Sequence, residues 1–450
     1  MSKKILFLVL SFFITTHTFA QNDCFEVLNQ TFDSITSQSQ IWGFSAAMLL
    51  PDGCLWKRAS GTAQELPDEQ PLTTDHVMGI GSVTKSFVSA TILLMMEDGL
   101  LNLDDPIGMY LAPYPNVPPE ATIRQLLSHT SGIANYLPFI VNAWNIYPDS
   151  IWVIDTILHH YLLGTNSPLG TYKYSDTNYL LACRIIEEGT GTGQSWYEVV
   201  RERILDPLGL THTYAYPYEL PNQPFAHVWD NHNGDYEDLQ GNGTSLDGVF
   251  AFGAGAGGLI SNPEDLARFS ERLHGGHLLQ PSSLQEMHTD YPGTGINGLG
   301  VKSLGNNVWG HGGAIFYYAR AYYYTNDSMA LVVQQNDSRQ DGSGSMYIDF
   351  REVNDALRDA FLTVSTTDYH PEESFRVFPN PAKDKITLDV SENLSINDPL
   401  PCFLIDATGR VLQTFKIEGN RTELFVGQMP KGLYFIKVGN STMKISLIRD

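Results

Sequence analysis

The chain has 450 residues, 42% of them hydrophobic and 17% charged, and this composition is typical of a globular protein rather than a disordered one. Its 27 basic and 50 acidic residues give a formal net charge of −23, which argues against nucleic acid and anionic lipid as partners. The length predicts about two or three domains.

The first twenty residues are typical of a secretory signal. Lys3 and Lys4 precede the apolar run Ile5–Ile14, and the small residue Ala20 offers a cleavage point. This run is too short to span a bilayer, and no later stretch approaches the length of a transmembrane helix. We therefore expect residues 1–20 to be removed. The mature protein, without a transmembrane segment, would be exported through the periplasm and secreted or held at the cell surface.

The four cysteines, Cys24, Cys54, Cys183 and Cys402, match no metal-site spacing. Export permits a disulfide between Cys24 and Cys54, and the sequence leaves open whether it forms. Cys183 lies in an apolar helical run and is expected in the core.

The first structural elements are a hairpin and a long helix. Residues 42–50 and 54–61 flank Pro51-Asp52-Gly53, which predicts a β-hairpin. Residues 84–98 are predicted to form a helix that Gly99 closes. This helix is apolar on almost all sides, so we expect it in the middle of a domain.

The chain between residues 120 and 364 is mostly helical by its apolar periodicity. Helices are predicted at 122–129, 150–163, 178–189, 195–205, 263–276 and 351–364, and strands at 316–324 and 329–337. Strands at both ends of a helical middle indicate an α+β domain whose first and last segments share one sheet. The loops 135–166 and 227–249, which would shape a pocket, have no predicted structure.

After residue 364 the character of the chain changes. A polar linker leads into short alternating segments at 375–390, 402–417 and 433–450, which predict a small all-β module of about 75 residues. The expected organisation is a signal at 1–20, a main domain at 21–363, a linker at 364–374 and this module at 375–450.

A Ser-x-x-Lys pattern occurs twice, at Ser82–Lys85 and at Ser441–Lys444. The second copy falls in a predicted strand, where residues three apart point to opposite faces. On a helix such residues are neighbours, so Lys85 can reach the Ser82 hydroxyl. The helix N-terminus favours negative charge, and burial is expected to lower the pKa of Lys85 enough to make it a base near neutral pH. The simpler alternative is an N-cap at Ser82 with Lys85 directed to solvent.

Two further segments carry candidate functional groups. Tyr174-Ser175-Asp176 precedes a predicted helix, so Asp176 could equally be a simple cap. Gly310-His311-Gly312-Gly313 precedes the tyrosine-rich strand, and its glycines would either let the backbone pass close to a ligand or form an ordinary turn.

The order and separation of these segments carry a resemblance. GSVTKSF, TIRQLLSHTSGI, YSDTNYLLACRIIEEGTG, GAGAGGLISNPEDLARFSERLHGG and GHGG resemble the motifs of the serine β-lactamase and D-alanyl-D-alanine carboxypeptidase superfamily, in the branch that holds class C β-lactamases and related esterases. The resemblance covers roughly residues 40–360. It implies an α+β, β-lactamase/transpeptidase-like fold, in which an antiparallel sheet is flanked by helices and joined by a helical subdomain.

The resemblance also implies roles for individual residues. Ser82 would be acylated, Lys85 would take its proton, and Tyr174 would pass that proton to the leaving group. The backbone N–H groups of Ser82 and Ala314 would form the oxyanion hole. Further substrate-binding positions are implied at Asp176, His311 and Gly313. No metal or cofactor is implied.

Two departures from the family pattern bear on the substrate. Gly312 replaces a hydroxyl residue that in many relatives helps to hold a substrate carboxylate. Asp176 places a negative charge where the family usually has asparagine. Both changes weaken the binding of an anion, so we expect hydrolysis of small esters or peptides to exceed that of penicillins.

The C-terminal module carries a second resemblance. VFPNPAKDKITL, MPKGLYFIKV and KISLIRD resemble the C-terminal sorting domain of type IX secretion. This implies a partner in the type IX secretion machinery and leaves open whether the module is cleaved. The alternative is a generic β-sandwich accessory module.

The sequence therefore predicts an exported serine hydrolase that forms an acyl-serine intermediate with a small ester, an amide or a D-Ala-containing peptide. The alternatives are a β-lactamase proper and a non-catalytic penicillin-binding sensor on the same fold.

Overall fold

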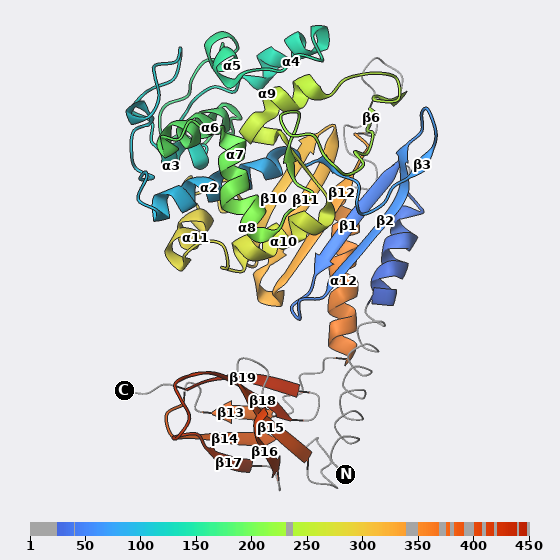
Figure 1. Ribbon diagram of the computed structural model, residues 1–450, viewed down its shortest axis with the longest axis vertical. Coiled ribbons are helices and arrows are strands. Elements are labelled where there is room, and N and C mark those ends of the chain that lie inside the picture. Colours follow the sequence, from blue (N-terminus) through green and yellow to red (C-terminus); the bar gives the residue numbers. More distant parts are fainter. Residues whose placement is uncertain are drawn as a thin grey trace. The chain divides into compact units, whose positions relative to one another are not determined.

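The computed structural model describes residues 25–39, 41–230, 237–338, 350–368, 375–378, 382–390, 400–406, 411–417, 421–438 and 441–447. The chain divides into two compact units, residues 1–361 and 362–450, and each is described by itself (Figure 1). The expected signal at 1–20 lies outside the described residues, as does Cys24, and Cys54 is a free thiol. Within the described ranges no helix has the length and apolar character needed to cross a membrane.

A seven-stranded sheet forms the centre of the first unit, in the order β3-β2-β1-β12-β11-β10-β9. Every pair of neighbouring strands in it is antiparallel. Strand β1 lies between β2 and β12, so the first and last strands share one sheet, as predicted. The strands are β1 (Gly43–Leu49), β2 (Leu55–Gln64), β3 (Gln70–Pro71), β9 (Lys302–Gly305), β10 (Val308–Ile315), β11 (Tyr317–Tyr324) and β12 (Met329–Gln335).

Both faces of this sheet are covered, because β1 alternates its side chains between two hydrophobic cores. Ala47 belongs to the larger core, which includes helix α10 (Pro263–His274). Met48 belongs to the second core, which the helix at residues 25–36 and α12 (Phe350–Asp368) complete. Burial on both faces explains why the sequence of β1 is apolar except at Ser45.

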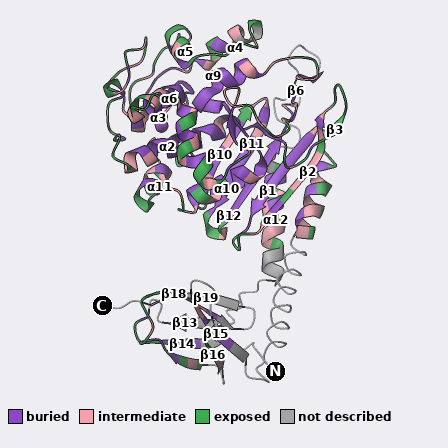
Figure 2. Ribbon diagram, in the orientation of Figure 1, coloured by how far each residue is buried: buried purple, intermediate pink, exposed green. Residues whose placement is uncertain are grey.

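The larger core continues into a helical region built around α2 (Thr84–Glu97), which is buried along most of its length (Figure 2). Its apolar sequence predicts this position. The helices around it are α3 (Ile123–Leu127), α4 (Leu137–Ile146), α5 (Ile154–His160), α6 (Thr177–Thr190), α7 (Trp196–Val200) with its continuation η3 (Arg201–Leu205), α8 (Asp206–Leu208), α9 (Asp247–Gly257) and α11 (Pro281–His288).

Small sheets complete the first unit. Strands β4 (Met78–Gly79), β8 (Leu259–Ser261) and β5 (Tyr214–Ala215) form a three-stranded sheet, and β6 (Trp229–Asp230) pairs with β7 (Glu237–Asp238). Strand β4 leads directly into the 3₁₀ turn η1 (Gly81–Val83), and α2 follows this turn without a break. The start of the central helix is therefore anchored to a sheet.

The helix at 25–36 and helices α4, α9 and α11 were not predicted from the sequence, and the GHGG segment lies within strand β10 rather than in a turn. Of these segments, α9 and β10 are rich in glycine, which is a poor signal for a helix or a strand. Pairing with β9 and β11 on its two sides holds β10 extended. Helix α12 ends at Asp368, inside the linker predicted at 364–374, because no glycine or proline interrupts the sequence before Pro371.

From residue 375 onward the described part of the second unit is all-β, as predicted. One sheet has the order β13-β14-β17 and the other β16-β15-β18-β19. The strands are β13 (Phe375–Phe378), β14 (Lys385–Val390), β15 (Leu400–Asp406), β16 (Val411–Ile417), β17 (Arg421–Phe425), β18 (Gly432–Val438) and β19 (Ser441–Leu447). This unit has a hydrophobic core of its own, which includes Ile386, Leu404 and Ile436.

Candidate active site

Ser82 lies in η1, and Lys85 lies in the first turn of α2. The spacing of three residues places both side chains on one side of the helix start. The Lys85 Nζ atom donates a hydrogen bond to Ser82 Oγ at 3.0 Å. Ser82 is half-buried, whereas the Lys85 side chain has no exposed surface. The second Ser-x-x-Lys copy lies in strand β19, where this spacing does not make residues neighbours.

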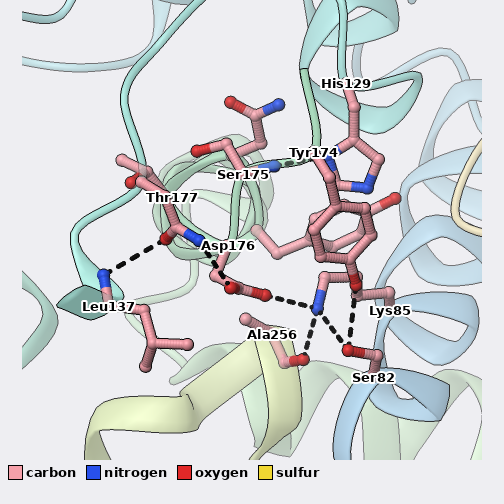
Figure 3. Close-up of polar contacts among 12 residues, drawn as sticks. Ser82, Lys85, His129, Leu137, Tyr174, Ser175, Asp176, Thr177 and Ala256 are labelled. Carbon is pink, nitrogen blue, oxygen red and sulfur yellow. Dashed lines mark hydrogen bonds and ion pairs between the residues drawn. The ribbon is translucent and has the colours of Figure 1, made fainter. Parts of the chain in front are cut away.

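Tyr174 reaches the same hydroxyl from the segment that precedes α6. Its phenol donates a hydrogen bond to Ser82 Oγ at 2.9 Å. Figure 3 shows the ammonium of Lys85 and the phenol of Tyr174 converging on this oxygen. The three residues that the sequence singled out are thus brought together around one hydroxyl.

The Lys85 ammonium is also held by Asp176 and by the backbone of α9. It lies 2.7 Å from Asp176 Oδ1 and donates to the Ala256 carbonyl oxygen at 2.6 Å (Figure 3). The other carboxylate oxygen of Asp176 accepts a hydrogen bond from Asn135 Nδ2 at 2.9 Å. The backbone of α9 is kinked at Ala254, with φ 39° and ψ −131°, two residues before the carbonyl that Lys85 contacts.

The Asp176 contact corrects the expected charge state of Lys85. Burial is the largest single influence and alone would lower the pKa of the lysine, but the contributions of Asp176 and Tyr174 together outweigh it, so the pKa is raised from 10.5. The sequence argument treated Asp176 as a substrate-binding position and so left out its attraction for the ammonium. At rest Lys85 is a charged donor with three oxygen acceptors.

Strand β10 passes directly over η1. A Cβ atom on Gly313 would lie 1.8 Å from the Ile80 carbonyl oxygen and 3.0 Å from the Ser82 nitrogen. A Cβ atom on Gly81 would lie 2.6 Å from the Ala314 nitrogen. Glycine at 81 and 313 therefore permits this approach, which brings the backbone amides of Ser82 and Ala314 to one place, as two oxyanion-hole donors require.

Two buried histidines, His129 and His311, also lie in or next to these segments. The His129 ring packs against the Tyr174 ring at a tilt of 34°, with centroids 4.2 Å apart, and its Nδ1 accepts the Ser175 N–H at 3.3 Å. Burial, followed by the charges of Lys85 and Lys302, holds the pKa of His129 well below 6.5. His311 is buried, and the same three causes hold its pKa well below 6.5.

Among the described contacts, His311 has no hydrogen bond to the Ser82 hydroxyl. Its Nδ1 lies 2.5 Å from the Gly312 carbonyl oxygen, a contact within strand β10 itself.

Asn135, His129 and Lys302 are neighbours of the site that the sequence did not identify. His129 lies in TIRQLLSHTSGI, a segment that matched the family pattern but received no role. Its φ of 58° is uncommon for a residue other than glycine and is a structural signal of a special position. Asn135 and Lys302 come from regions with no motif, so only tertiary structure reveals them.

The described residues include no group of three or more His, Cys, Asp or Glu side chains that could hold a metal ion. Two surface cavities of about 520 and 470 Å³ lie elsewhere, beside Leu220 and Arg272 respectively, and neither is lined by a residue of this site. The groups that the structure brings together at the site are a hydroxyl, an ammonium and a phenol, with backbone amides close by.

Comparison with known families gives two matches. The family model described as Beta-lactamase matches residues 28–350. The family model described as Secretion system C-terminal sorting domain matches residues 376–447.

Individual relatives are distant. Penicillin-binding protein 4* of Bacillus subtilis is 27% identical over 270 residues, which cover 57% of each chain. The chain thus spans little more than half the length of that relative. Esterase EstB of Burkholderia gladioli is 25% identical over 63% of this chain and 78% of its own. Among solved structures, the D-amino acid amidase of Ochrobactrum anthropi SV3 complexed with L-phenylalanine amide superimposes with a TM-score of 0.64 at 25% identity, over 77% of this chain and 99% of its own.

Proposed function

The chain belongs to the β-lactamase family, and we propose that it is an exported serine hydrolase that cleaves small esters, amides or D-Ala-containing peptides through an acyl-serine intermediate. One observation carries the proposal, namely the convergence of Lys85 Nζ and Tyr174 OH on Ser82 Oγ at 3.0 and 2.9 Å. A nucleophilic hydroxyl needs a group that takes its proton and a group that returns a proton to the leaving group.

In the proposed acylation, Ser82 Oγ attacks the acyl carbonyl carbon and forms a tetrahedral intermediate. The backbone amides of Ser82 and Ala314 stabilise the negative charge on its oxygen. The bond to the leaving group then breaks, and the leaving group takes up one proton. Water attacks the acyl-serine in the second half of the reaction and releases the acid, which regenerates the Ser82 hydroxyl.

The proton path has to accommodate the charge on Lys85. A lysine that is an ammonium at rest accepts the Ser82 proton only after it has lost one of its own. We propose that Lys85 acts as the base in its neutral form and that Tyr174 passes the proton on to the leaving group. Negative charge that develops on the phenol during this transfer lies near the Lys85 and Lys302 ammonium groups, 5.0 and 5.1 Å from the centre of the ring.

The proposed substrate class rests on the relatives and on the contacts of Asp176. The similar proteins include an esterase, a D-amino acid amidase and a teichoic acid D-alanine hydrolase. In this chain the Asp176 carboxylate pairs with the Lys85 ammonium and accepts a hydrogen bond from Asn135. Its negative charge is therefore largely balanced by groups of the protein itself. A panel of p-nitrophenyl acetate, D-amino-acid amides, D-Ala-D-Ala peptides and a chromogenic cephalosporin tests the proposal, with Ser82→Ala as the control. If the protein hydrolyses none of these substrates, the proposal is wrong.

A non-catalytic penicillin sensor is the second candidate, because two penicillin-binding proteins of Bacillus subtilis are among the similar proteins. A fluorescent penicillin separates the two functions. An enzyme turns over at least one substrate of the panel, whether or not it releases the penicillin quickly, whereas a sensor keeps the label for hours and turns over none. Persistence of the adduct, together with no turnover in the panel, favours the sensor.

The C-terminal unit supplies the route of export. Its match to the sorting domain marks the protein for export to the cell surface or the medium. We propose that the protein loses residues 1–20 on entering the periplasm and from there reaches the type IX secretion machinery.

A further inference from the structure

His129 holds the segment that carries Tyr174, although the two residues come from different parts of the chain. Residues 171–175 form neither a helix nor a strand, so no regular ladder of hydrogen bonds fixes the place of Tyr174. The residues on both sides of it are bound to His129 instead. The Lys173 N–H donates to the His129 carbonyl oxygen at 2.9 Å, and the Ser175 N–H donates to His129 Nδ1 at 3.3 Å.

The imidazole ring of His129 also fixes the direction of the phenol. It packs against the Tyr174 ring with centroids 4.2 Å apart, and Figure 3 shows this contact beside the hydrogen bond from Tyr174 OH to Ser82 Oγ. The imidazole in turn lies 5.4 Å from the buried ring of Tyr179. The phenol oxygen is at the far end of its side chain, so a small tilt of the ring moves it away from Ser82. A misplacement of about 1 Å costs a catalytic group on the order of 100-fold in rate.

The backbone of His129 gives a second reason to assign a role to its side chain. Helix α3 ends in a Schellman cap, with hydrogen bonds from His129 N–H to the Leu126 carbonyl at 3.1 Å and from Thr130 N–H to the Gln125 carbonyl at 2.9 Å. His129 occupies the left-handed position of this cap, with φ 58°, where glycine is the usual residue because it has no Cβ. A histidine there costs conformational energy that the cap does not require, and its contacts with the Tyr174 segment offset that cost.

The charge state of His129 argues against a role as a second base. Its Nδ1 accepts the Ser175 N–H, so the ring proton is on Nε2 and the acceptor nitrogen is already in use. Burial, followed by the charges of Lys85 and Lys302, holds the pKa of the ring well below 6.5. A neutral imidazole also adds no third positive charge beside the two lysines. The influence of His129 on the reaction therefore passes through Tyr174.

We propose that His129 is a positioning residue that orients the Tyr174 phenol toward Ser82 Oγ and the leaving group. This inference rests on the proposed function, since it assumes that Tyr174 takes part in the reaction of Ser82. If the two residues act as a unit, loss of His129 matters only while the phenol is present. A purely structural histidine would instead lower the activity by the same factor with or without the phenol.

The rate of Ser82 labelling by a fluorophosphonate tests this coupling in wild type, His129→Asn, Tyr174→Phe and the double variant. Asparagine tolerates a positive φ and keeps an acceptor near the position of Nδ1, so the cap and the Ser175 contact remain while the ring is lost. With Tyr174 present, His129→Asn should slow labelling roughly 10- to 100-fold. In the Tyr174→Phe background, the same change should alter the rate by less than about threefold. Labelling is a single event that can be followed for hours, so slow variants remain measurable.

His76→Asn is the matched control. His76 is also buried, and its Nδ1 also accepts a backbone N–H, from Thr73 at 3.1 Å, but it makes no described contact with the site around Ser82. This variant should change the labelling rate by less than about threefold. His129→Gly suits the cap best and removes both side-chain contacts, so its loss should be at least as large and should depend on Tyr174 in the same way. The thermal midpoint of each variant shows whether the protein remains folded.

The two levels of the proposal fail in different ways. If His129→Asn and His129→Gly slow labelling equally in both backgrounds, or in neither, while Ser82→Ala abolishes it, the inference about His129 is wrong and the proposed function stands. The inference is also wrong if Tyr174→Phe is labelled at the wild-type rate. If the fluorophosphonate does not label Ser82 in wild type, the proposed function and the inference are both wrong.

Discussion

At the scale of single residues, the site is organised by the contacts of one buried ammonium group. Lys85 donates to Ser82, Asp176 and Ala256 at 3.0, 2.7 and 2.6 Å. The contacts with Asp176 and Ala256 favour the charged form of the lysine, and the third contact directs it toward Ser82, the proposed nucleophile. If Lys85 is the base, its ion pair with Asp176 sets the pH at which it can accept a proton.

Asp176→Asn tests this control of the base. In wild type, Lys85 has a raised pKa, so kcat/KM should rise with pH as the ammonium loses its proton. The amide keeps a polar contact but removes the negative charge, so the pKa of Lys85 falls and the rise moves to lower pH by about one to two units. The measurement is the pH profile of ester hydrolysis, with Asp98→Asn as a control outside the site. A profile that does not move would show that Lys85 is not the base.

The sequence identified the groups that converge on Ser82 but not the charge balance around them. Ser82 and Lys85 are three residues apart on one helix, so local geometry fixes their contact. Asp176, Asn135 and Lys302 meet Lys85 and Tyr174 only through tertiary structure. For this reason the predicted direction of the Lys85 pKa shift was wrong.

At the scale of secondary-structure elements, the close approach of β10 to η1 would form the proposed oxyanion site. Gly313→Ala would place a methyl group 1.8 Å from the Ile80 carbonyl, so β10 has to move away from Ser82. Loss of one oxyanion donor lowers kcat by about 100- to 1,000-fold. Steady-state kinetics of ester hydrolysis should show this loss.

Gly312→Ala is the matched control for that variant, since its methyl group meets only the Ala319 carbonyl oxygen, at 3.8 Å. Gly312→Ala and Gly313→Ala each add one methyl group, at neighbouring positions of β10. We expect kcat of Gly312→Ala to stay within about threefold of wild type. Equal losses in the two variants would contradict the role given to the β10–η1 contact.

A pair of histidines joins α10, α11 and β10 away from the active site. The Nδ1 atom of His274 and the Nε2 atom of His288 are 3.0 Å apart, and His288 stacks on Trp309 at 4.3 Å. Burial lowers the pKa of His288 from 6.5 to about 4, and burial together with His288 lowers that of His274. Both rings are therefore neutral in the folded protein at pH 7.

This pair predicts a loss of stability in acid. Between pH 6.5 and about 4, His288 is protonated in the unfolded chain but neutral in the folded protein. The free energy of unfolding therefore has its full value above pH 6.5 and decreases as the pH drops, by about 3 kcal/mol in total for a pKa shift of this size. His288→Phe keeps the ring stack and should flatten this fall in denaturant unfolding between pH 7 and 4. The control is His160→Asn, at an exposed position. An unchanged slope in His288→Phe would contradict the prediction.

Periodicity predicted the elements whose side chains alternate regularly and missed those rich in glycine. Helices α2 and α6 have continuous apolar sequence and were found close to their observed bounds. Helix α9 reads DGVFAFGAGAG and β10 reads VWGHGGAI, and both are determined by their packing partners rather than by propensity. The elements that the sequence missed thus include two that supply backbone groups to the site.

At the scale of the whole molecule, the two units have separate hydrophobic cores and separate tasks. The described site residues all belong to the unit at 1–361, and the sorting-domain match falls in the unit at 362–450. A variant that ends at Ser374 should keep kcat/KM for esters within about twofold of wild type, since its core and site are unchanged. In cells it should accumulate in the periplasm.

Full-length Ser82→Ala is the converse control, because it should be exported normally without activity. Fractionation of cells and medium with an activity assay measures both properties. Appearance of the truncated variant outside the cell at wild-type levels would contradict the sorting role of the second unit.

The rate of covalent labelling by a fluorophosphonate tests most directly whether Ser82 is a nucleophile activated by its neighbours. Peptide mass spectrometry should find the adduct on Ser82, and Lys85→Gln and Tyr174→Phe should each slow labelling by at least about 100-fold while the thermal midpoint shows that the protein remains folded. Labelling at another residue, or at an unchanged rate in folded Lys85→Gln, would contradict the assignment.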